Sequence, residues 1–275
     1  MAIPDRLTTV RRAAATGPES RERGFFMARV AATARLSRSM QRITLAASEL
    51  AAFHAQGGDQ FVRLLFPAPG QHRPVLPVTS DWWQELLALP ADERPALRNY
   101  TVRRLRHDRA ELDIDFVLHG SSGPGTRWAA DARPGDRVGV LEQDRTHAPG
   151  PRSDDWQLLV GDETALPTIA AILEQHSTGA RVDCFIEVPS SDDIQSLEHQ
   201  PGAQVRWLPR DASHPPPGAL AAHAVREAQL PPGPGYAWVA GEAGMTTAVR
   251  RHLVRDRGFD KGAVTFCGYW RHTDH

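Results

Sequence analysis

The residues with the clearest chemical potential are four consecutive ones: Arg98, Asn99, Tyr100 and Thr101. On a β-strand, Arg98 and Tyr100 would point to one face and Thr101 to the other. An arginine fork can neutralise a pyrophosphate, a tyrosine ring can cover a flat ring system, and a threonine hydroxyl can bond a heteroatom at its edge. An exposed arginine beside a core tyrosine would give the same tetrapeptide, so these residues alone decide nothing.

A glycine-rich turn follows further along the chain. The run DFVLHG (residues 115–120) leads into GPGTRW (residues 123–128). Such a turn, opening a short helix, presents free backbone N–H groups that bind phosphate. Thr126 suits the N-cap of that helix and could also donate to a phosphate oxygen. The spacing G-x-x-G-x-G differs from the dinucleotide fingerprint G-x-G-x-x-G, and the turn does not follow the first strand of a βαβ unit. It therefore predicts a phosphate site on a β-domain, which suits a flavin dinucleotide.

The elements around these motifs predict an antiparallel barrel. Short runs alternate apolar and polar residues, as half-buried strands do, and turn residues separate them. About six antiparallel strands with small helices are expected, and a closed barrel would hide their edges. The predicted strands are FFMARVAATARL, QRITLAA, QFVRLLFP, NYTVRRLR, ELDIDFVLHG and the run after Pro134.

Near residue 150 the pattern changes to strands alternating with helices, which indicates parallel βαβ units. Ligands of open α/β sheets bind beyond the carboxyl ends of the strands. Those ends carry GDET (161–164), EVPSSDD (187–193) and AGEAGM (240–245). The predicted organisation is an N-terminal arm over residues 1–23, a barrel domain over 24–150, and an α/β domain with a C-terminal tail over 151–275.

Composition narrows the function classes. The net charge of -1 favours neither nucleic acid nor an acidic membrane as a partner. No apolar run reaches the roughly 20 residues of a membrane span, and no secretory signal is seen, so we expect a cytoplasmic protein. The two cysteines cannot hold an iron–sulfur cluster, no compact metal-ligand spacing occurs, and an organic cofactor must carry any electrons. Nothing demands more than a monomer.

Together these motifs resemble the siderophore-interacting protein family, FAD-dependent ferric-siderophore reductases of the ferredoxin-reductase-like superfamily. The resemblance runs from about Phe25 to Arg271. It depends on RNYTVRR, DFVLHGSSGPGTRWA, PGDRVGV, VGDETALPTIAAILE, FIEVPSSDDIQSL, VAGEAGMTTAVRRHL and GYWR, of which GDETALP and GYWR are the most particular to the family.

The resemblance implies which residues bind FAD. The flavin and its phosphates would be held by Arg98, Tyr100, Thr101 and the adjoining Val102. The isoalloxazine and ribityl side would be lined by Asp115, Val117 and His119. The pyrophosphate and its helix would be held by Gly123, Pro124, Gly125, Thr126 and Trp128. Near the adenosine end and the domain cleft would lie Asp162, Glu163 and Thr164, and Trp270 would approach the flavin where the nicotinamide arrives.

The implied substrate is a ferric siderophore, with Lys261 and Arg271 as candidate contacts and Arg63, Arg103 and Arg250 as weaker ones. We expect flavin chemistry without a general acid or base and without a metal site. The implied donor is NADH or NADPH: the acids after the second α/β strand disfavour a 2′-phosphate, Arg206 and Arg210 could reverse this, and a ferredoxin donor stays open. Two other functions remain, a general NAD(P)H:flavin or ferredoxin reductase and a siderophore carrier without turnover.

Overall fold

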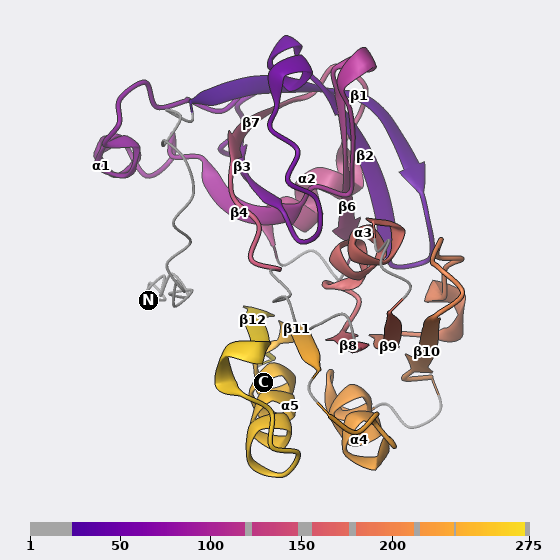
Figure 1. The fold of residues 1–275 in the computed structure, drawn as a ribbon. Helices are drawn as coiled ribbons and strands as arrows, with labels where there is room; N and C mark the ends of the chain where they lie inside the picture. Colours follow the sequence, from indigo (N-terminus) through magenta and orange to yellow (C-terminus); the bar gives the residue numbers. More distant parts are fainter. Residues whose placement is uncertain are drawn as a thin grey trace.

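The computed structural model describes residues 24–118, 123–147, 156–175, 180–211, 215–233 and 235–272. The arm predicted for residues 1–23 and the candidate flavin residue His119 lie outside the described residues. Within them the chain forms one antiparallel and one parallel sheet, and Figure 1 shows the two sheets in separate halves of the molecule. This arrangement confirms the predicted fold class.

The antiparallel sheet has seven strands, one more than predicted, in the order β4-β3-β7-β1-β2-β6-β5. The run NYTVRRLR is not one strand, because it bends at Val102 and Arg103. The Val102 N–H donates to the Gln60 carbonyl at 2.9 Å, and the Arg103 N–H donates to the Asp113 carbonyl at 3.0 Å. The chain thus crosses from one edge of the sheet to the other, and this crossing closes the barrel where the prediction had a continuous ladder. The strands are β1 (Phe25–Arg35), β2 (Met40–Ala46), β3 (Phe61–Phe66), β4 (Ala96–Thr101), β5 (Arg104–Arg106), β6 (Glu111–Val117) and β7 (Arg137–Glu142).

Strand β6 shows how the alternation of the sequence builds the barrel core. Leu112, Ile114 and Phe116 are fully buried inside it, and each such side chain stabilises the fold by about 2 kcal/mol. The residues between them, Asp113 and Asp115, point outward and form ion pairs. Four short helices accompany the barrel, the 3-10 helices η1 (Ser48–Ala52) and η2 (His107–Arg109) and the α-helices α1 (Trp82–Ala88) and α2 (Pro124–Asp131).

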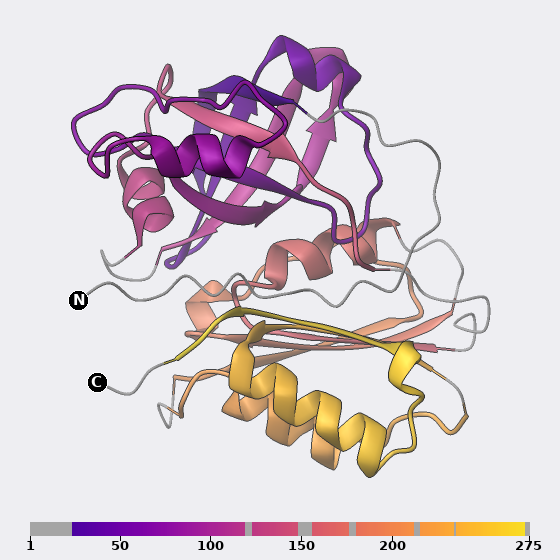
Figure 2. The ribbon, with the colours of Figure 1, turned by 90° about the vertical axis from the view of Figure 1, so that its left-hand side faces the viewer.

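The second sheet has five parallel strands in the order β10-β9-β8-β11-β12. Figure 2 shows α3 on the side that faces the barrel and α4 and α5 on the other side. The strand order reverses between β8 and β11, the point where α/β sheets bind ligands. Among the described residues, none of the helices has the length and apolar character to cross a membrane. The elements are β8 (Trp156–Gly161), α3 (Leu166–Gln175), β9 (Arg181–Val188), η3 (Ser191–Asp193), β10 (Ala203–Pro209), α4 (Ala219–Glu227), β11 (Tyr236–Glu242), α5 (Ala243–Arg255), η4 (Lys261–Ala263) and β12 (Val264–Trp270).

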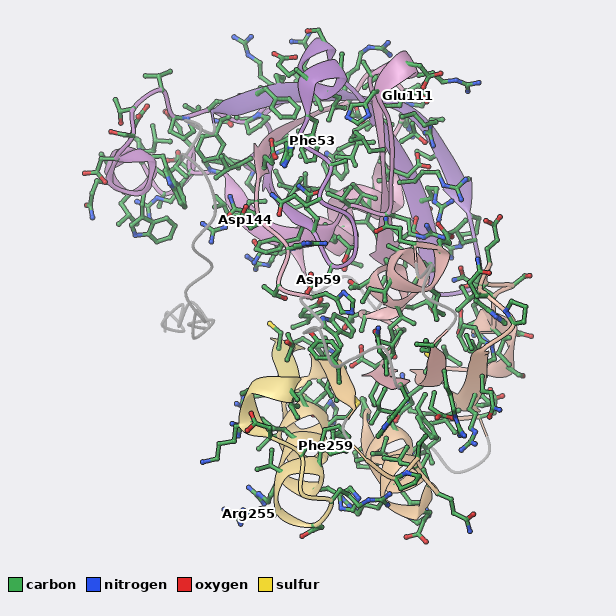
Figure 3. The ribbon with its side chains drawn as sticks, in the orientation of Figure 1. Phe53, Asp59, Glu111, Asp144, Arg255 and Phe259 are labelled. Atoms are coloured by element: carbon green, nitrogen blue, oxygen red, sulfur yellow. The ribbon has the colours of Figure 1, made fainter. Side chains whose placement is uncertain are left out.

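The barrel and the α/β domain share one interface, centred on α3. Met40 of the barrel is buried in the same apolar cluster as Ile169 of α3 and Ile186 of β9. Polar bonds surround this cluster: the Trp238 indole N–H donates to Asp59 at 3.0 Å. Figure 3 shows Asp59 on the side of the barrel that faces the α/β domain. The two sheets therefore form one packed body rather than two independently tumbling units.

Asp193 joins the two domains through several hydrogen bonds to its carboxylate. It is only 3% exposed and accepts hydrogen bonds from the Ser37 and Ser39 hydroxyls, both at 2.7 Å, and from the Ser39 backbone N–H at 2.8 Å. Within its own domain it also accepts from the Ser190 hydroxyl at 2.9 Å. Burial acts to raise the pKa of Asp193, but the hydrogen bonds from Ser39 and Ser37 outweigh it, and the pKa is lowered.

We expect Asp193→Ala to lower the free energy of unfolding at pH 7 by about 2–3 kcal/mol, because several hydrogen bonds to a charged group are lost. A lowered pKa stabilises the folded state above the unfolded pKa of about 3.9, and the benefit disappears as the pH falls through the folded pKa. The gap between variant and wild type in urea unfolding should therefore shrink below about pH 4. The exposed neighbour Asp192→Ala is the control and should unfold like the wild type. Equal stability of both variants would contradict this role of Asp193.

Candidate flavin and nucleotide site

Tyr100 lies at the edge of the barrel with its ring packed inward. It pairs with Val62 across β3, and its ring centroid lies 4.3 Å from that of Phe116 and 6.1 Å from that of Phe66. Burial raises the pKa of Tyr100, and the Arg98 charge opposes this only in part, so the hydroxyl stays protonated. The sequence left open a flavin-covering or a core tyrosine; in this structure the residue is partly buried, packs against the barrel core, and its hydroxyl lies beside the glycine-rich turn.

That turn leaves the first N–H groups of α2 without a side-chain cap. Gly123 occupies the N-cap position with extended backbone and Pro124 begins the helix, so the predicted N-cap role of Thr126 is wrong. No side chain of the described residues bonds the cap. The Thr126 hydroxyl donates instead to the Val117 carbonyl at 3.3 Å. A Cβ on Gly125 would overlap the Tyr100 hydroxyl and come within 3.2 Å of its Cζ, so only glycine fits there. Uncapped N–H groups at a close-packed glycine turn form an anion site.

Arg98 supplies a cation on the same strand face as Tyr100. Its side chain is exposed, it donates to the Leu97 carbonyl at 2.6 Å, and it has no carboxylate partner among the described residues. Trp128 anchors the helix from inside, with its ring 5.3 Å from that of Phe66. A free guanidinium, uncapped N–H groups and an aromatic hydroxyl fit the pyrophosphate and adjoining ring system of a dinucleotide such as FAD.

Three hydroxyl groups meet where the barrel touches α3. The Thr101 hydroxyl lies 2.6 Å from that of Thr168, which lies 3.5 Å from the Tyr269 hydroxyl. A hydroxyl donates once and accepts twice, so Thr101 keeps bonding capacity for a further ligand. Beside it, Val102 packs against the barrel core. The last candidate flavin residues of β4 therefore lie directly at the junction between the two domains.

Asp115 is committed to ion pairs rather than left free for a ligand. It binds Arg42 in two bonds of 2.7 and 2.8 Å and lies 3.7 Å from the Arg103 guanidinium. Arg103 reaches on to Glu174 of α3, with one bond of 2.9 Å. Arg103, a weaker candidate for siderophore contact, is therefore part of the interface, and Val117 packs at the same interface.

Asp162, directly after β8, forms hydrogen bonds to the ends of β11 and β12 at the point where the strand order reverses. Its carboxylate accepts from the Thr164 N–H at 2.9 Å and hydroxyl at 2.5 Å, from the Glu242 N–H at 2.6 Å, and from the Trp270 indole N–H at 2.9 Å. Burial raises the pKa of Asp162, and these bonds oppose the rise. The Glu242 carboxylate accepts from the Met245 N–H at 2.8 Å and caps α5. The structure brings Asp162, Thr164 and Trp270 together, although the resemblance implied different ends of the cofactor for them.

Glu163 lies on the other side of this edge, in a buried ion-pair cluster with Arg210 and Glu187. The Arg210 guanidinium donates to both oxygens of Glu163, at 2.9 and 3.1 Å, and to Glu187 at 2.8 Å. Hydrogen bonds from Gly218 and Ala221 at the start of α4 also hold Glu187. This cluster was not predictable from the sequence, because its three charges come from separate segments.

Tyr269 is a residue of the site that the sequence analysis missed. In β12, Gly268 pairs with Gly241 and Trp270 pairs with Glu242, so Tyr269 is an extra, unpaired residue, a β-bulge. The residue is 42% exposed and its hydroxyl lies by Thr168, whereas the Trp270 indole donates to Asp162. Of these two neighbouring aromatic residues, Tyr269 is therefore the more exposed. Its position beside Trp270 was visible in the sequence, but the bulge was not.

The candidate substrate residues do not form one cluster. Lys261 lies with Arg250, Arg251 and Arg255 along a groove of about 520 Å³, and Figure 3 shows Arg255 at the end of the α/β domain far from the barrel. Arg271 follows the opposite end of β12, about 20 Å away at the rise of a strand. The weaker candidates Arg63 and Arg250 stack on the rings of Trp82 and Phe266. In the described part of the chain, no three potential metal ligands come together.

Two family models match the chain, one on each domain. Residues 29–146 match the siderophore-interacting FAD-binding domain, and residues 154–273 match the siderophore-interacting protein model. The first covers the barrel with α2, and the second covers the parallel sheet with Asp162 and Trp270. The junction at which the candidate residues meet is thus the junction of the two matched regions.

Individual proteins resemble the chain over most of its length. Ferric vibriobactin reductase ViuB of Vibrio cholerae is 30% identical over 240 residues, which is 86% of this chain and 85% of ViuB. A siderophore utilization protein from T. fusca is 34% identical, with a TM-score of 0.79 over 94% of this chain and 96% of the other. The siderophore-interacting protein SipS from Aeromonas hydrophila is 30% identical, with a TM-score of 0.73 over 91% of this chain and 99% of SipS.

Proposed function

Because the chain belongs to the family of siderophore-interacting proteins, we propose that it is an FAD-dependent oxidoreductase that passes electrons from NAD(P)H to the iron of a ferric siderophore. A hydride carries two electrons, so each nicotinamide oxidised serves two ferric ions. Fe(II) is held less tightly than Fe(III) by hard oxygen ligands, and the iron is released. The free thiols of Cys184 and Cys267 suit a reducing cytoplasm.

One observation carries the proposal: the barrel residues that suit a dinucleotide lie next to the edge of the parallel sheet at which the strand order reverses. Arg98 and the uncapped turn at Gly123 lie on the barrel side, and Thr101 contacts α3 directly. When bound, FAD supplies the exchange between two-electron and one-electron chemistry. A nucleotide at the strand ends then meets the barrel ligand without a large domain motion.

The protein contributes binding and position rather than proton transfer. Arg98 and the α2 N–H groups neutralise the pyrophosphate, and Thr101 bonds the edge of the ring system. Tyr269 covers the exposed face of that ring from the α/β domain and keeps water away from it. Asp162 holds the Trp270 indole and the start of α5 in place, so that the edge of the parallel sheet at which the nucleotide binds is rigid. Arg271, exposed beyond Trp270, is the cation that we assign to the anionic iron complex.

The test is an anaerobic spectrum of the purified single chain while pyridine nucleotide and then a ferric siderophore are added. A flavin spectrum that bleaches with nucleotide and returns with the iron complex supports the full cycle. Bleaching without return supports a flavin reductase with another acceptor, and reduced ferredoxin tests the other donor. A protein that takes up no FAD would overturn the proposal and leave a siderophore carrier.

Tyr269→Ala is expected to weaken FAD binding by about tenfold, because an aromatic contact and its burial are lost at a site that otherwise keeps its fold. Trp270→Phe is expected to leave FAD affinity within about twofold but to lower the free energy of unfolding by about 1–3 kcal/mol, since buried Asp162 loses a donor. Fluorescence titration with FAD and urea unfolding measure the two effects. The reverse pattern would mean that Trp270, not Tyr269, faces the flavin.

A further inference from the structure

We infer that this chain selects NADH over NADPH, because the arginine best placed to meet a 2′-phosphate, Arg210, is already occupied by two carboxylates. The inference rests on the proposed function and names the donor of that same reaction. In α/β sheets, the group that reads the adenosine ribose follows the second strand of the unit. Here that strand is β9, and the Arg210 N–H donates to the carbonyl of its last residue, Val188, at 3.1 Å.

Three of the five N–H donors of the Arg210 guanidinium are already used. It donates in a fork to both oxygens of Glu163 and with a further bond to Glu187. The side chains of Arg210, Glu163 and Glu187 are 11%, 9% and 0% exposed. A phosphate binds arginine best through the same fork that Glu163 already fills.

Releasing Arg210 to a phosphate would be unfavourable. Glu187 is fixed by the N–H groups of Gly218 and Ala221, at 2.7 and 2.9 Å, so it cannot follow the arginine outward. Breaking a buried ion pair leaves its carboxylates desolvated and without a counter-charge. The cluster therefore stays closed, and its overall charge is negative.

The segments next to the cluster add more negative charge. Asp192 and Asp211 are exposed on the loops after β9 and β10, and Asp211 accepts from the Ser191 N–H at 2.8 Å. Arg206 does not offset them, since it lies in mid-strand with its guanidinium over the Phe185 ring at 5.1 Å. A phosphate dianion would be repelled here, whereas the 2′-hydroxyl of NADH can donate to a carboxylate.

Two measurements on the FAD-loaded protein test the inference. In stopped-flow reduction, kcat/KM for NADH should exceed that for NADPH by at least about tenfold. In calorimetry, which needs no turnover, 5′-AMP should bind at least about tenfold more tightly than 2′,5′-ADP. Equal reduction by both nucleotides, or tighter binding of 2′,5′-ADP, would overturn the inference and leave the proposed function standing. Reduction by neither nucleotide would overturn the proposed function instead.

Variants locate the cause of the selectivity. Glu163→Gln keeps the size of the side chain and frees part of the Arg210 fork, so the NADPH/NADH ratio of kcat/KM should rise about tenfold. Asp192→Asn changes an exposed residue, cannot disturb the buried cluster, and should raise the same ratio about threefold at low salt. The control Asp108→Asn, exposed on the barrel, should leave the ratio unchanged. An unchanged ratio in both test variants would contradict the assignment.

Discussion

A Gly125→Val variant should purify without flavin and bind added FAD about 100-fold more weakly than the wild type, as expected for the loss of two charge-assisted hydrogen bonds. The side chain would enter the space of the Tyr100 hydroxyl and ring, and it would approach Phe66 to within 3.4 Å. Tyr100 must then leave its contact with Phe116, and the turn that presents the α2 N–H groups must shift. Both parts of the proposed dinucleotide site are disturbed by one substitution.

Overpacking also costs about 1–3 kcal/mol of stability, so the fold needs its own control. Gly24→Val adds the same side chain to the same domain at a position where no atom of the described residues lies within 4 Å, and it should keep wild-type FAD affinity. Circular dichroism and urea unfolding show whether Gly125→Val remains folded. A folded Gly125→Val protein with normal FAD affinity would exclude the turn as the pyrophosphate site.

Gly241→Ala should slow flavin reduction by nucleotide about 100-fold while FAD remains bound, since small displacements at a positioning site can cost that much. Gly241 has a φ of +129°, where side chains are strained, and its Cβ would lie 2.6 Å from the Asp162 carboxyl carbon. Asp162 would be pushed off the Glu242 N–H and the Trp270 indole. Strain and displacement together should lower the free energy of unfolding by about 3 kcal/mol.

The matched control is Gly258→Ala. Gly258 also has a positive φ, +71°, but no atom lies within 4 Å of its Cβ position, so it isolates backbone strain from the contact with Asp162. It should lose some stability and keep normal reduction kinetics. Should both alanine variants slow reduction equally, strain rather than the Asp162 contact would be the cause.

The pattern of strands and helices was predictable because it depends on local periodicity. Alternation in ELDIDFVLHG produced β6 with Ile114 inside and Asp115 outside, as a half-buried strand requires. The seventh strand was missed because the change of edge at Val102 leaves the alternation of NYTVRRLR undisturbed. Only hydrogen bonds to distant residues, Gln60 and Asp113, reveal that bend.

Sequence motifs identified candidate site residues, but they did not predict side-chain directions and contacts that depend on tertiary packing. GDETALP and GYWR singled out Asp162 and Trp270, but the hydrogen bond between these two residues was not predicted. The direction of Tyr100 depends on its aromatic neighbours Phe66 and Phe116, which lie on other strands. From the sequence alone, Arg210 was a candidate to bind a 2′-phosphate. Only the tertiary structure shows that it forms ion pairs with Glu163 and Glu187.

The unpaired residue in β12 also bears on how such a site evolves. Because side chains alternate along a strand, deleting one residue at the bulge would restore the register and turn Trp270 to the face that Tyr269 now occupies. A substitution can change the chemistry of the ring at the junction, but only an insertion or deletion can change which position supplies it. The length of this last strand, and not only its composition, therefore decides which aromatic ring lies at the junction.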